Sequence, residues 1–173
     1  ELAEPLLNGF AKDLIDDAKK RPETIIYSSG GLYGATHLPV ALLEKVTGIP
    51  KLRHLPTNGG GPAITALLGN NAQMSVQSVS ASLPHIKAGK LRPLASFGGK
   101  RVTSVPDVPT LKELGYDVEY YLWVGIFAPK GTPASTVATL SAAIDKAGTS
   151  DAHKTAMSNA GLQADYLNAA GFA

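Results

Sequence analysis

The sequence predicts an α/β fold with a mainly parallel sheet flanked by helices. Short segments rich in β-branched and apolar residues alternate with stretches whose apolar residues recur at helical spacing. Glycine-rich, polar loops join the first two strands to the helices that follow them. Strands separated by helices of about ten residues are typical of βαβ crossovers, whose right-handed connections place helices on both faces of a sheet.

Three strand–loop–helix units are predicted in the first part of the chain. An amphipathic helix over 9–20, ended by Pro22, precedes them. In the first unit, Thr36 is the expected N-cap of the helix and Gly48 its expected end. In the second unit, Pro62 stands at the expected first helical position. The predicted strands are 24–27, 51–55, 73–77 and a fourth at 91–97, and the third helix spans 78–88 around Pro84.

The last third of the chain has a different pattern of predicted elements. An irregular, proline-rich stretch is followed by one long strand-like run and two alanine-rich helices, at 98–109, 118–128, 134–146 and 151–160. We therefore expect one lobe at 1–119, and at 120–173 a crossing strand with an incomplete part of a second lobe.

Composition narrows the classes of function. The 173 residues are 44% hydrophobic and contain no cysteine, which allows a buried core and excludes disulfides, iron–sulfur clusters and thiolate sites. The net charge of +2 is too small for nucleic-acid binding. The apolar runs are short, so we expect no membrane-embedded segment. Because the chain opens at Glu1 without a leader and stops soon after a helix, we expect a fragment.

The two glycine-rich loops are the best candidates for a binding site. Such loops gather at the carboxyl ends of the strands, where backbone N–H groups and helix N-termini favour an anion. Hydroxyl groups at Ser28, Ser29 and Thr36 add donors to the first loop, and Thr57 and Asn58 add polar groups to the second. Glycine and serine also form tight turns in most strand-to-helix connections, and that explanation stays open.

Nucleotide, metal and nucleophile signatures are missing from the sequence. Gly61 is followed by Pro62 instead of the Gly-Lys pair of a phosphate-binding loop, and Tyr27 stands where an esterase elbow needs glycine. The histidines His37, His54, His85 and His153 never fall at i, i+4, so we expect neither a metal nor a cofactor. His37, at a helix start, is either a base or an ordinary hydrogen-bonding residue.

An aromatic cluster at 120–127 has two readings. Tyr121 and Trp123 share one face of the predicted strand and are possible ligand contacts at a crossing between lobes. Core packing is the alternative, and it is the explanation we favour for Phe127.

Several motifs in fixed order resemble one family. SLPHIKAGKLRPLA at 82–95, VPDVPTLKELGY at 105–116 and WVGIFAPKGTP at 123–133 are similar to hallmark stretches of the Bug-type substrate-binding proteins of tripartite tricarboxylate transporters. The stretches 27–38 and 55–69 fit the same family, so that the resemblance covers nearly the whole chain.

The resemblance implies a periplasmic receptor with two α/β lobes that close on a small carboxylate, deliver it to membrane permease subunits and catalyse nothing. It implies that 1–119 is the second ligand-binding lobe and that 120–173 returns to the first. It also implies that the loop 28–36, the loop 57–61 and the region after the third strand face one cleft. The ligand-binding residues expected on both grounds are Ser28, Ser29, Gly30, Gly31, Tyr33, Thr36, His37, Thr57, Asn58, Gly59, Gln77 and Ser78.

The chain departs from the family at informative positions. It has Thr57 and Asn58 where members usually show an aromatic and often a basic residue, and Gln73 and Gln77 where they commonly carry acids. A neutral Gln77 would not pair with an amine, so we expect a di- or tricarboxylate or related organic acid instead of an amino acid. The family's N-terminal strand and Pro-Gly-Gly loop have no counterpart here, and an exposed lobe face favours dimerisation.

Two other classes of function remain open at this stage. An α/β hydrolytic enzyme acting on a small carboxylate or ester would need His37 within hydrogen-bond reach of Ser28 or Ser29, with an acid behind it. A stand-alone interaction or sensor module would bind a protein partner without a ligand.

Overall fold

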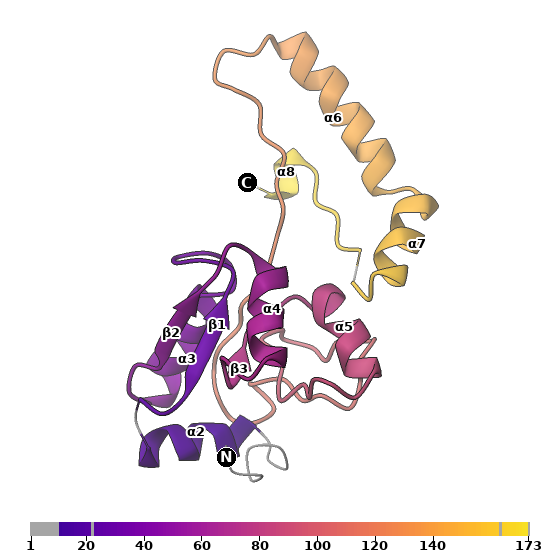
Figure 1. The fold of residues 1–173 in the computed structure, drawn as a ribbon. Coiled ribbons are helices and arrows are strands. Elements are labelled where there is room, and N and C mark those ends of the chain that lie inside the picture. Colours follow the sequence, from indigo (N-terminus) through magenta and orange to yellow (C-terminus); the bar gives the residue numbers. More distant parts are fainter. Residues whose placement is uncertain (1–10, 22, 163, 173) are drawn as a thin grey trace. The chain divides into compact units, whose positions relative to one another are not determined.

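The computed structural model describes residues 11–21, 23–162 and 164–172 (Figure 1). The chain divides into two compact units, Glu1–Leu122 and Trp123–Ala173. Among the described residues, unit 1 contains the sheet and four helices, and unit 2 contains three helices.

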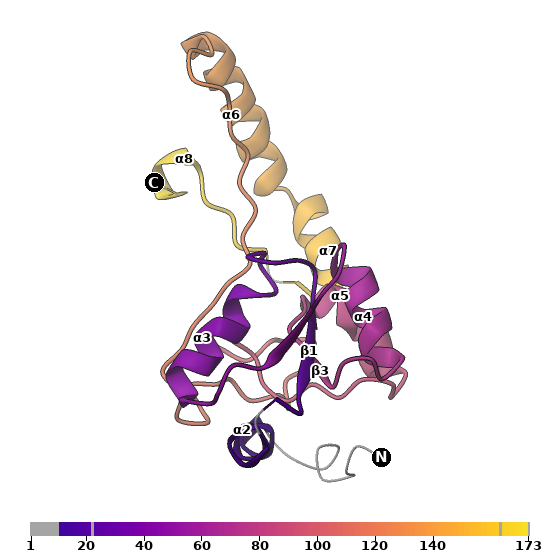
Figure 2. The same ribbon diagram turned by 60° about the vertical axis from the view of Figure 1, so that its left-hand side comes forward.

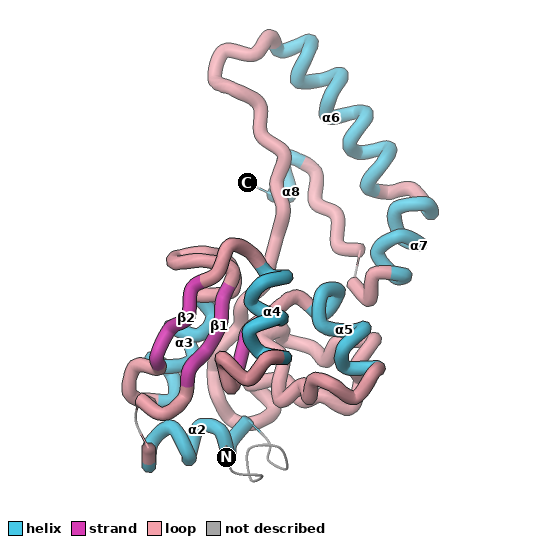
Figure 3. The backbone as a smooth tube through the Cα atoms, in the orientation of Figure 1, coloured by secondary structure: helices cyan, strands magenta, loops and turns pink. Residues whose placement is uncertain are grey.

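A three-stranded parallel sheet forms the centre of unit 1 (Figure 3). The strands are β1 (Ile26–Ser29), β2 (Arg53–Pro56) and β3 (Met74–Ser75), in the order β2-β1-β3. Tyr27 pairs with His54 on one side and Met74 on the other, and Ser28 pairs with Leu55 and Ser75. The predicted α/β class with a parallel sheet is confirmed.

β1 and β2 are shifted by one or two residues from their predicted positions, and β3 is shortened from the predicted 73–77 to Met74–Ser75. The sequence predicts β1 at 24–27, yet pairing runs from Ile26 to Ser29 and buries the last three of these residues. Backbone partners on both sides, and not β propensity alone, decide where a central strand begins and ends. The polar Ser28 and Ser29 are therefore part of the strand instead of the loop that follows it.

Helices cover both faces of this sheet, as predicted (Figure 2). The helices of unit 1 are α2 (Ala11–Lys20), α3 (Leu38–Thr47), α4 (Gly60–Leu68) and α5 (Val79–Lys87). Val40 and Leu43 of α3 belong to the same buried cluster as Tyr27 and Met74. On the opposite face, the Ser28 hydroxyl donates to the carbonyl of Ala63 in α4, at 2.8 Å.

The hydrophobic core lies between α2, α3 and one face of the sheet. Leu14, Ile15 and Ala18 project from one side of α2 at helical spacing and are all buried. The described members of the core cluster are Ala11, Leu14, Ile15, Ala18, Ile25, Tyr27, Val40, Leu43, Ile49, Leu52, Met74, Leu111 and Val118. This core holds the strands in place, so that their carboxyl ends meet at one edge.

Two helix starts differ from prediction. His37, and not Thr36, occupies the N-cap of α3, and α4 begins at Gly60, two residues before Pro62. The Thr36 hydroxyl oxygen instead accepts a hydrogen bond from the amide of Gly30, at 2.8 Å. A partner across the loop therefore replaces the capping bond that short-range sequence rules predict.

The strand predicted at 91–97 does not form. One isolated parallel bridge joins Ser96 to Thr110, with Ser96 donating its amide to Pro109 and accepting from Leu111, both at 2.9 Å. Pro93 has no N–H to donate to a ladder, and a further backbone bond to this segment, from the amide of Tyr120 to the carbonyl of Phe97 at 3.0 Å, comes from a different part of the chain. The apolar character of 91–97 instead buries part of Leu94, Ala95 and Phe97 against the core.

The long strand predicted at 118–128 is also wrong. Residues 119–128 have no regular secondary structure, and the side chain of Val124 is 88% exposed. A β-strand is stable only with a hydrogen-bonded neighbour, and no described strand pairs with this segment. The prediction of the strand rested on side-chain type, which cannot supply that neighbour.

Unit 2 contains α6 (Ala134–Gly148), α7 (Asp151–Asn159) and α8 (Ala169–Phe172). The helices predicted at 134–146 and 151–160 are confirmed. The rings of Trp123 and Phe127 contact Phe172, with centroids 5.2 Å and 6.4 Å apart. Phe127 is nevertheless 75% exposed, so our preference for a core role there is wrong in this structure. No helix in the described part of the chain is long and apolar enough to cross a membrane.

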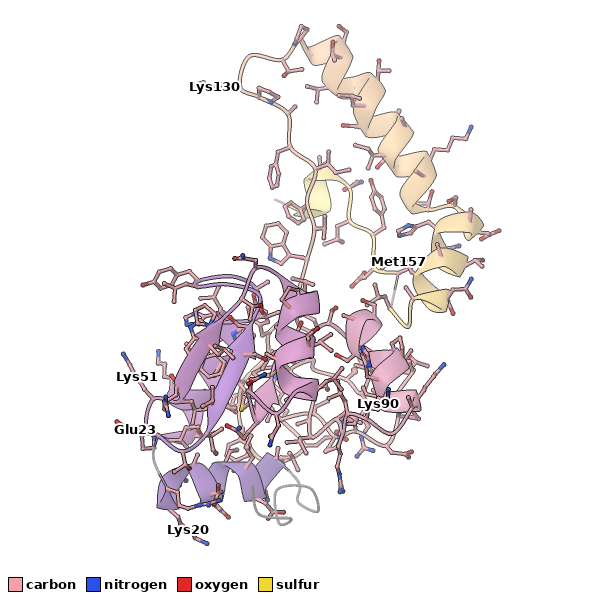
Figure 4. The ribbon with its side chains drawn as sticks, viewed as in Figure 1. Lys20, Glu23, Lys51, Lys90, Lys130 and Met157 are labelled. Carbon is pink, nitrogen blue, oxygen red and sulfur yellow. The ribbon has the colours of Figure 1, made fainter. Side chains whose placement is uncertain are left out.

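Lysines are distributed over the surface of unit 1 instead of forming one patch. Lys20 at the end of α2, Lys51 before β2 and Lys90 after α5 project from separate segments (Figure 4). All three side chains are exposed. This distribution agrees with the small net charge, and the expectation that the protein does not bind nucleic acid stays a prediction.

Candidate functional site

The loops after β1 and β2 lie side by side at the carboxyl edge of the sheet. Thr57 donates its amide to the carbonyl of Ser29 at 2.9 Å, and its hydroxyl lies 2.9 Å from the same oxygen. Gly59 donates its amide to the carbonyl of Gly30 at 3.1 Å. The prediction that the two glycine-rich loops converge is therefore confirmed.

Glycine is required where these loops touch. A Cβ atom on Gly30 would lie 3.1 Å from the carbonyl carbon of Gly59 and 3.3 Å from the amide nitrogen of Gly60. Backbone atoms cannot move aside as a flexible side chain can. Gly59 itself adopts φ = 112°, a conformation that glycine adopts readily and other residues rarely do.

The junction after β3 joins the same site. Gln77 donates from Nε2 to the Ser75 hydroxyl at 2.9 Å, and that hydroxyl donates to the carbonyl of Ser28 at 2.8 Å. These bonds turn the other amide atom, Oε1, towards α4, where it lies 3.1 Å from the position of a Cβ on Gly60. Ser78 follows as the N-cap residue of α5. All three strand-to-helix junctions of unit 1 therefore meet in one place.

The serine hydroxyl groups at the end of β1 are engaged inside the protein. Ser28 and Ser29 are both fully buried. Ser28 bonds to Ala63, whereas Ser29 Oγ lies 3.1 Å from the carbonyl and 3.3 Å from the amide of Gly31. These internal bonds stabilise the shape of the loop. The ligand contacts predicted for Ser28 and Ser29 stay predictions.

Unengaged donors lie instead at the starts of α4 and α5. The amides of Gly60 and Gly61 in α4 have no acceptor among the described residues, and the same holds for Val79 and Ser80 in α5. The first turn of α3 differs, because the amides of its first residues bond to the preceding loop. Free N–H groups at a helix N-terminus carry partial positive charge and favour an anion.

These four amides are the donors that sequence reasoning missed. The residues Gly60, Gly61, Val79 and Ser80 lie beside the predicted Asn58, Gly59, Gln77 and Ser78 but were not themselves predicted. The signal available was the run of three glycines before Pro62, which allows a helix to begin at Gly60. The Asn58 side chain is exposed next to this helix start.

A cluster of rings lies behind the first loop, on the α3 face of the sheet. His54 stacks on Tyr27 with centroids 4.6 Å apart and planes 15° apart, and the His37 ring also lies 4.6 Å from His54. Tyr33, in the exposed part of the loop at φ = 59°, contacts His37 edge-on. The Nδ1 atom of His37 is buried and has no hydrogen-bond partner in the described structure.

The surroundings shift the pKa of two of these side chains, Tyr27 and His54. Burial, with a smaller contribution from the Glu44 carboxylate, raises the pKa of Tyr27 to about 12. Burial and then the neighbouring His37 lower the pKa of His54 below its ordinary value. The neutral forms of both side chains are therefore favoured near pH 7.

A serine–histidine contact is present, but it is not the one that the enzyme alternative requires. Ser29 Oγ lies 2.7 Å from Nε2 of His54, and not of His37. Among the described residues, no carboxylate bonds to either histidine and no group of three acidic or histidine side chains could hold a metal. A buried Ser29 without an acid behind its histidine does not form a nucleophile–base–acid arrangement.

The aromatic candidates Tyr121 and Trp123 contact residues that are not among the predicted ligand-binding residues. The Tyr121 hydroxyl accepts a hydrogen bond from the amide of Gly99 at 2.7 Å, and Trp123 packs on Phe172. Unit 2 contains an open cavity of about 500 Å³, and none of the predicted site residues lines it. Its lining residues are Asp145, Lys146, Thr149, Tyr166, Leu167 and Asn168.

Comparison with known proteins defines the family to which this chain belongs. Residues 7–173 match the family model described as "Tripartite tricarboxylate transporter family receptor". The chain belongs to that family, which confirms the resemblance drawn from the motifs.

Among curated relatives, the UPF0065 protein in the gbd 5′ region of Cupriavidus necator is 33% identical over 94% of this chain. Protein BugT of Bordetella pertussis is 35% identical over 78% of the chain. These alignments cover 49% and 41% of the two relatives. The chain thus spans about half the length of the curated relatives it matches.

Solved structures share the fold. The structure of an R. palustris protein with adipate has a TM-score of 0.81 at 28% identity, and the match covers 89% of this chain and 52% of that one. The periplasmic binding protein BugD has a TM-score of 0.76 at 31% identity, with 87% and 50% covered. A periplasmic transporter structure reaches a TM-score of 0.82 at 30% identity, with 93% and 54% covered.

Proposed function

We propose that the protein is an extracytoplasmic solute-binding protein that captures a small carboxylate for a tripartite tricarboxylate transporter. The observation that carries the proposal is the set of unengaged amides at the starts of α4 and α5, beside the loop that follows β1. Amide donors at helix N-termini bind carboxylates without a charged side chain. Family membership and the adipate-bound relative support the same ligand class.

The carboxylate is expected to lie against the second and third junctions. There Gly60, Gly61 and Ser80 supply amides, with Asn58 beside them. The first loop lies against the second junction through the bond between Gly59 and Gly30. The full set of predicted contacts remains Ser28, Ser29, Gly30, Gly31, Tyr33, Thr36, His37, Thr57, Asn58, Gly59, Gln77 and Ser78.

The ligand is expected to be a di- or tricarboxylate or related acid without an amine. The neutral Gln77 amide presents Oε1 towards α4, and its Nε2 is occupied by Ser75. A single neutral carbonyl oxygen binds an ammonium group much more weakly than a carboxylate does. Binding of aspartate or glutamate more tightly than simple dicarboxylates would contradict this part of the proposal.

We further propose the cellular setting that the family implies. Residues 1–119 are the second ligand-binding lobe and 120–173 the part that returns towards the first, and the receptor acts in the periplasm with membrane permease subunits as partners. The periplasmic proteins among its structural relatives support this setting. Binding and delivery, without catalysis, is the role proposed.

An NMR titration tests ligand binding directly. Adipate added to the 15N-labelled chain is expected to shift the amides of Gly60, Gly61, Val79 and Ser80, while the neutral adipamide does not. Absence of adipate-dependent shifts, or equal shifts with adipamide, would contradict the proposal. The titration also detects weak binding, which matters because affinity depends on how completely a ligand is enclosed.

A matched pair of variants tests the amide contact. Gly61→Pro removes one N–H while its fixed φ suits the first helical turn, and Gly61→Ala keeps the N–H. Nothing lies within 4 Å of a Cβ at this position, so the alanine side chain fits. We expect Gly61→Pro to weaken adipate binding about tenfold, the scale of one hydrogen bond to a charged group, and Gly61→Ala to bind like the native chain.

A further inference from the structure

Ser29 is the point at which the two glycine-rich loops and β2 are joined. Its carbonyl accepts from the amide of Thr57 at 2.9 Å, and the Thr57 hydroxyl lies 2.9 Å from this carbonyl and from that of Gly59. Its buried hydroxyl lies within hydrogen-bond distance of Gly31 and of Nε2 of His54, at 2.7 Å. The next residue, Gly30, accepts from Gly59. The orientation of Ser29 therefore influences where the first turn of α4 lies.

The Ser29 hydroxyl has one proton to share between two acceptors. When His54 carries hydrogen on Nε2, it donates to Ser29 Oγ, and the hydroxyl is then free to donate to the carbonyl of Gly31. When Nε2 is bare, the hydroxyl donates to His54, and the carbonyl of Gly31 loses that donor. The presence or absence of a hydrogen on Nε2 of His54 therefore determines whether the Ser29 hydroxyl donates to the carbonyl of Gly31 or to His54.

The surroundings of His54 allow this ring to keep its position through a change of proton. Tyr27 of β1 stacks on the His54 ring, and His37, at the start of α3, lies 4.6 Å from His54 and 6.2 Å from Tyr27. Glu44 of α3 is the nearby acid, and its Oε1 accepts from the amide of Leu52. Among the described residues, no carboxylate bonds to His54 itself. The Ser29 hydroxyl is therefore the hydrogen-bond partner that responds when Nε2 of His54 gains or loses a proton.

We propose that His54 is a positioning residue for the carboxylate site: through Ser29 it sets the backbone of residues 30 and 31 against Gly59 and thereby the amides of α4. This inference rests on the proposed function for its ligand. His54 acts through Ser29, and the side chain itself makes no contact with the carboxylate. The proton state of His54 and the shape of the loop change together.

The first experiment needs no ligand and no variant. A pH titration of the 15N-labelled chain follows the His54 ring and the amides of residues 30 and 31. The amides are expected to shift with the same midpoint as the ring, below the ordinary 6.5 of histidine because burial and His37 lower the pKa. In Ser29→Ala that shift should vanish while the ring still titrates. If the chemical shifts of the amides of residues 30 and 31 do not change as His54 titrates, the proposal is overturned.

The second experiment measures adipate affinity in paired variants. His54→Phe keeps a ring to stack on Tyr27 but loses Nε2, and His54→Gln places an amide near the position of Nε2. We expect a loss of about tenfold in His54→Phe, on the scale of one hydrogen bond, and a loss below about threefold in His54→Gln. His85→Gln, in the last turn of α5, is the matched control and should bind like the native chain.

The outcomes separate the inference from the proposed function. Native affinity in His54→Phe, or equal losses in the Phe and Gln variants, would overturn the positioning role. If adipate shifts no amide in the native chain, the proposed function fails together with the link to a ligand. The pH titration then still confirms or overturns the coupling between His54 and the loop.

Discussion

At the scale of single residues, the contact between Gly30 and Gly59 decides the shape of the site. The backbones approach so closely that a Cβ on Gly30 would lie 3.1 Å from one backbone atom and 3.3 Å from two others. The sequence predicts tight turns from these glycines, but only the structure shows that two loops press on each other. Glycine at position 30 allows the close approach of a neighbouring backbone and also allows the chain to turn.

Replacing Gly30 by alanine should therefore destabilise unit 1. We expect the free energy of unfolding to fall by about 1–3 kcal/mol, the usual cost of overpacking, because backbone must move. Gly61→Ala is the control, since its Cβ meets nothing within 4 Å and alanine favours a helix by about 1 kcal/mol over glycine. Urea unfolding of both variants measures the difference, and equal stabilities would contradict the predicted contact.

The serine and threonine hydroxyls show a second limit of residue-level reasoning. Ser28, Ser29 and Thr36 have the residue types of an anion site, yet each is bonded within the protein. The partner of Ser28 lies 35 positions away in sequence, and that of Ser29 lies 25 positions away. No local pattern reports such partners, which is why the free donors were assigned one or two residues from where they lie.

At the scale of elements, the segment that was expected to form a fourth strand is held by a turn. Thr110 donates its amide to Glu113 Oε2 at 2.7 Å, and Glu113 donates its amide to Thr110 Oγ1 at 3.1 Å. Arg101 bonds to the same carboxylate at 3.0 Å. This reciprocal pair resembles a capping box around a single turn, and it fixes Thr110 beside Ser96.

The turn should be sensitive to the Thr110 hydroxyl. Thr110→Val keeps the shape of the buried side chain but removes the acceptor, so we expect a loss of about 1 kcal/mol in unfolding free energy. Thr110→Ser keeps the acceptor and should lose less. Urea unfolding compares the two, and a valine variant more stable than the serine variant would contradict the role of this bond.

Helices were predicted more accurately than strands. The helices α3, α5, α6 and α7 lie within about two residues of their predicted bounds, because apolar spacing and stop signals are local. The strands predicted at 91–97 and 118–128 failed, because strand formation depends on a partner elsewhere in the chain. The order of strands in the sheet was likewise not readable from the sequence.

At the scale of the whole molecule, an apolar segment is left without cover. Within 121–127, the side chains with more than half of their surface exposed are Tyr121, Leu122, Trp123, Val124, Ile126 and Phe127. Contiguous exposed apolar surface of this kind favours association. The dimerisation expected from the sequence therefore stays a prediction, and this segment is where it should occur.

A charge on this segment should weaken self-association. Val124 is the most exposed of the six, so that Val124→Lys changes the surface without disturbing a core. We expect the native chain to associate with rising concentration, and the variant to dissociate at a concentration at least tenfold higher. Sedimentation equilibrium measures both, with Val137→Lys on the exposed side of α6 as control. A native chain that remains monomeric would refute the prediction.

The sequence alone determined the fold class, the sequence of helices, the two loops that meet at the sheet edge and, through its motifs, the family. These features depend on spacing and on residues close together in the chain. Only the tertiary structure decided which donors remain free for an anion and which are used inside the protein. That outcome depends on contacts between distant residues, such as Ser28 with Ala63 and Ser29 with His54. A polar group can bind a ligand only when no internal partner already holds it.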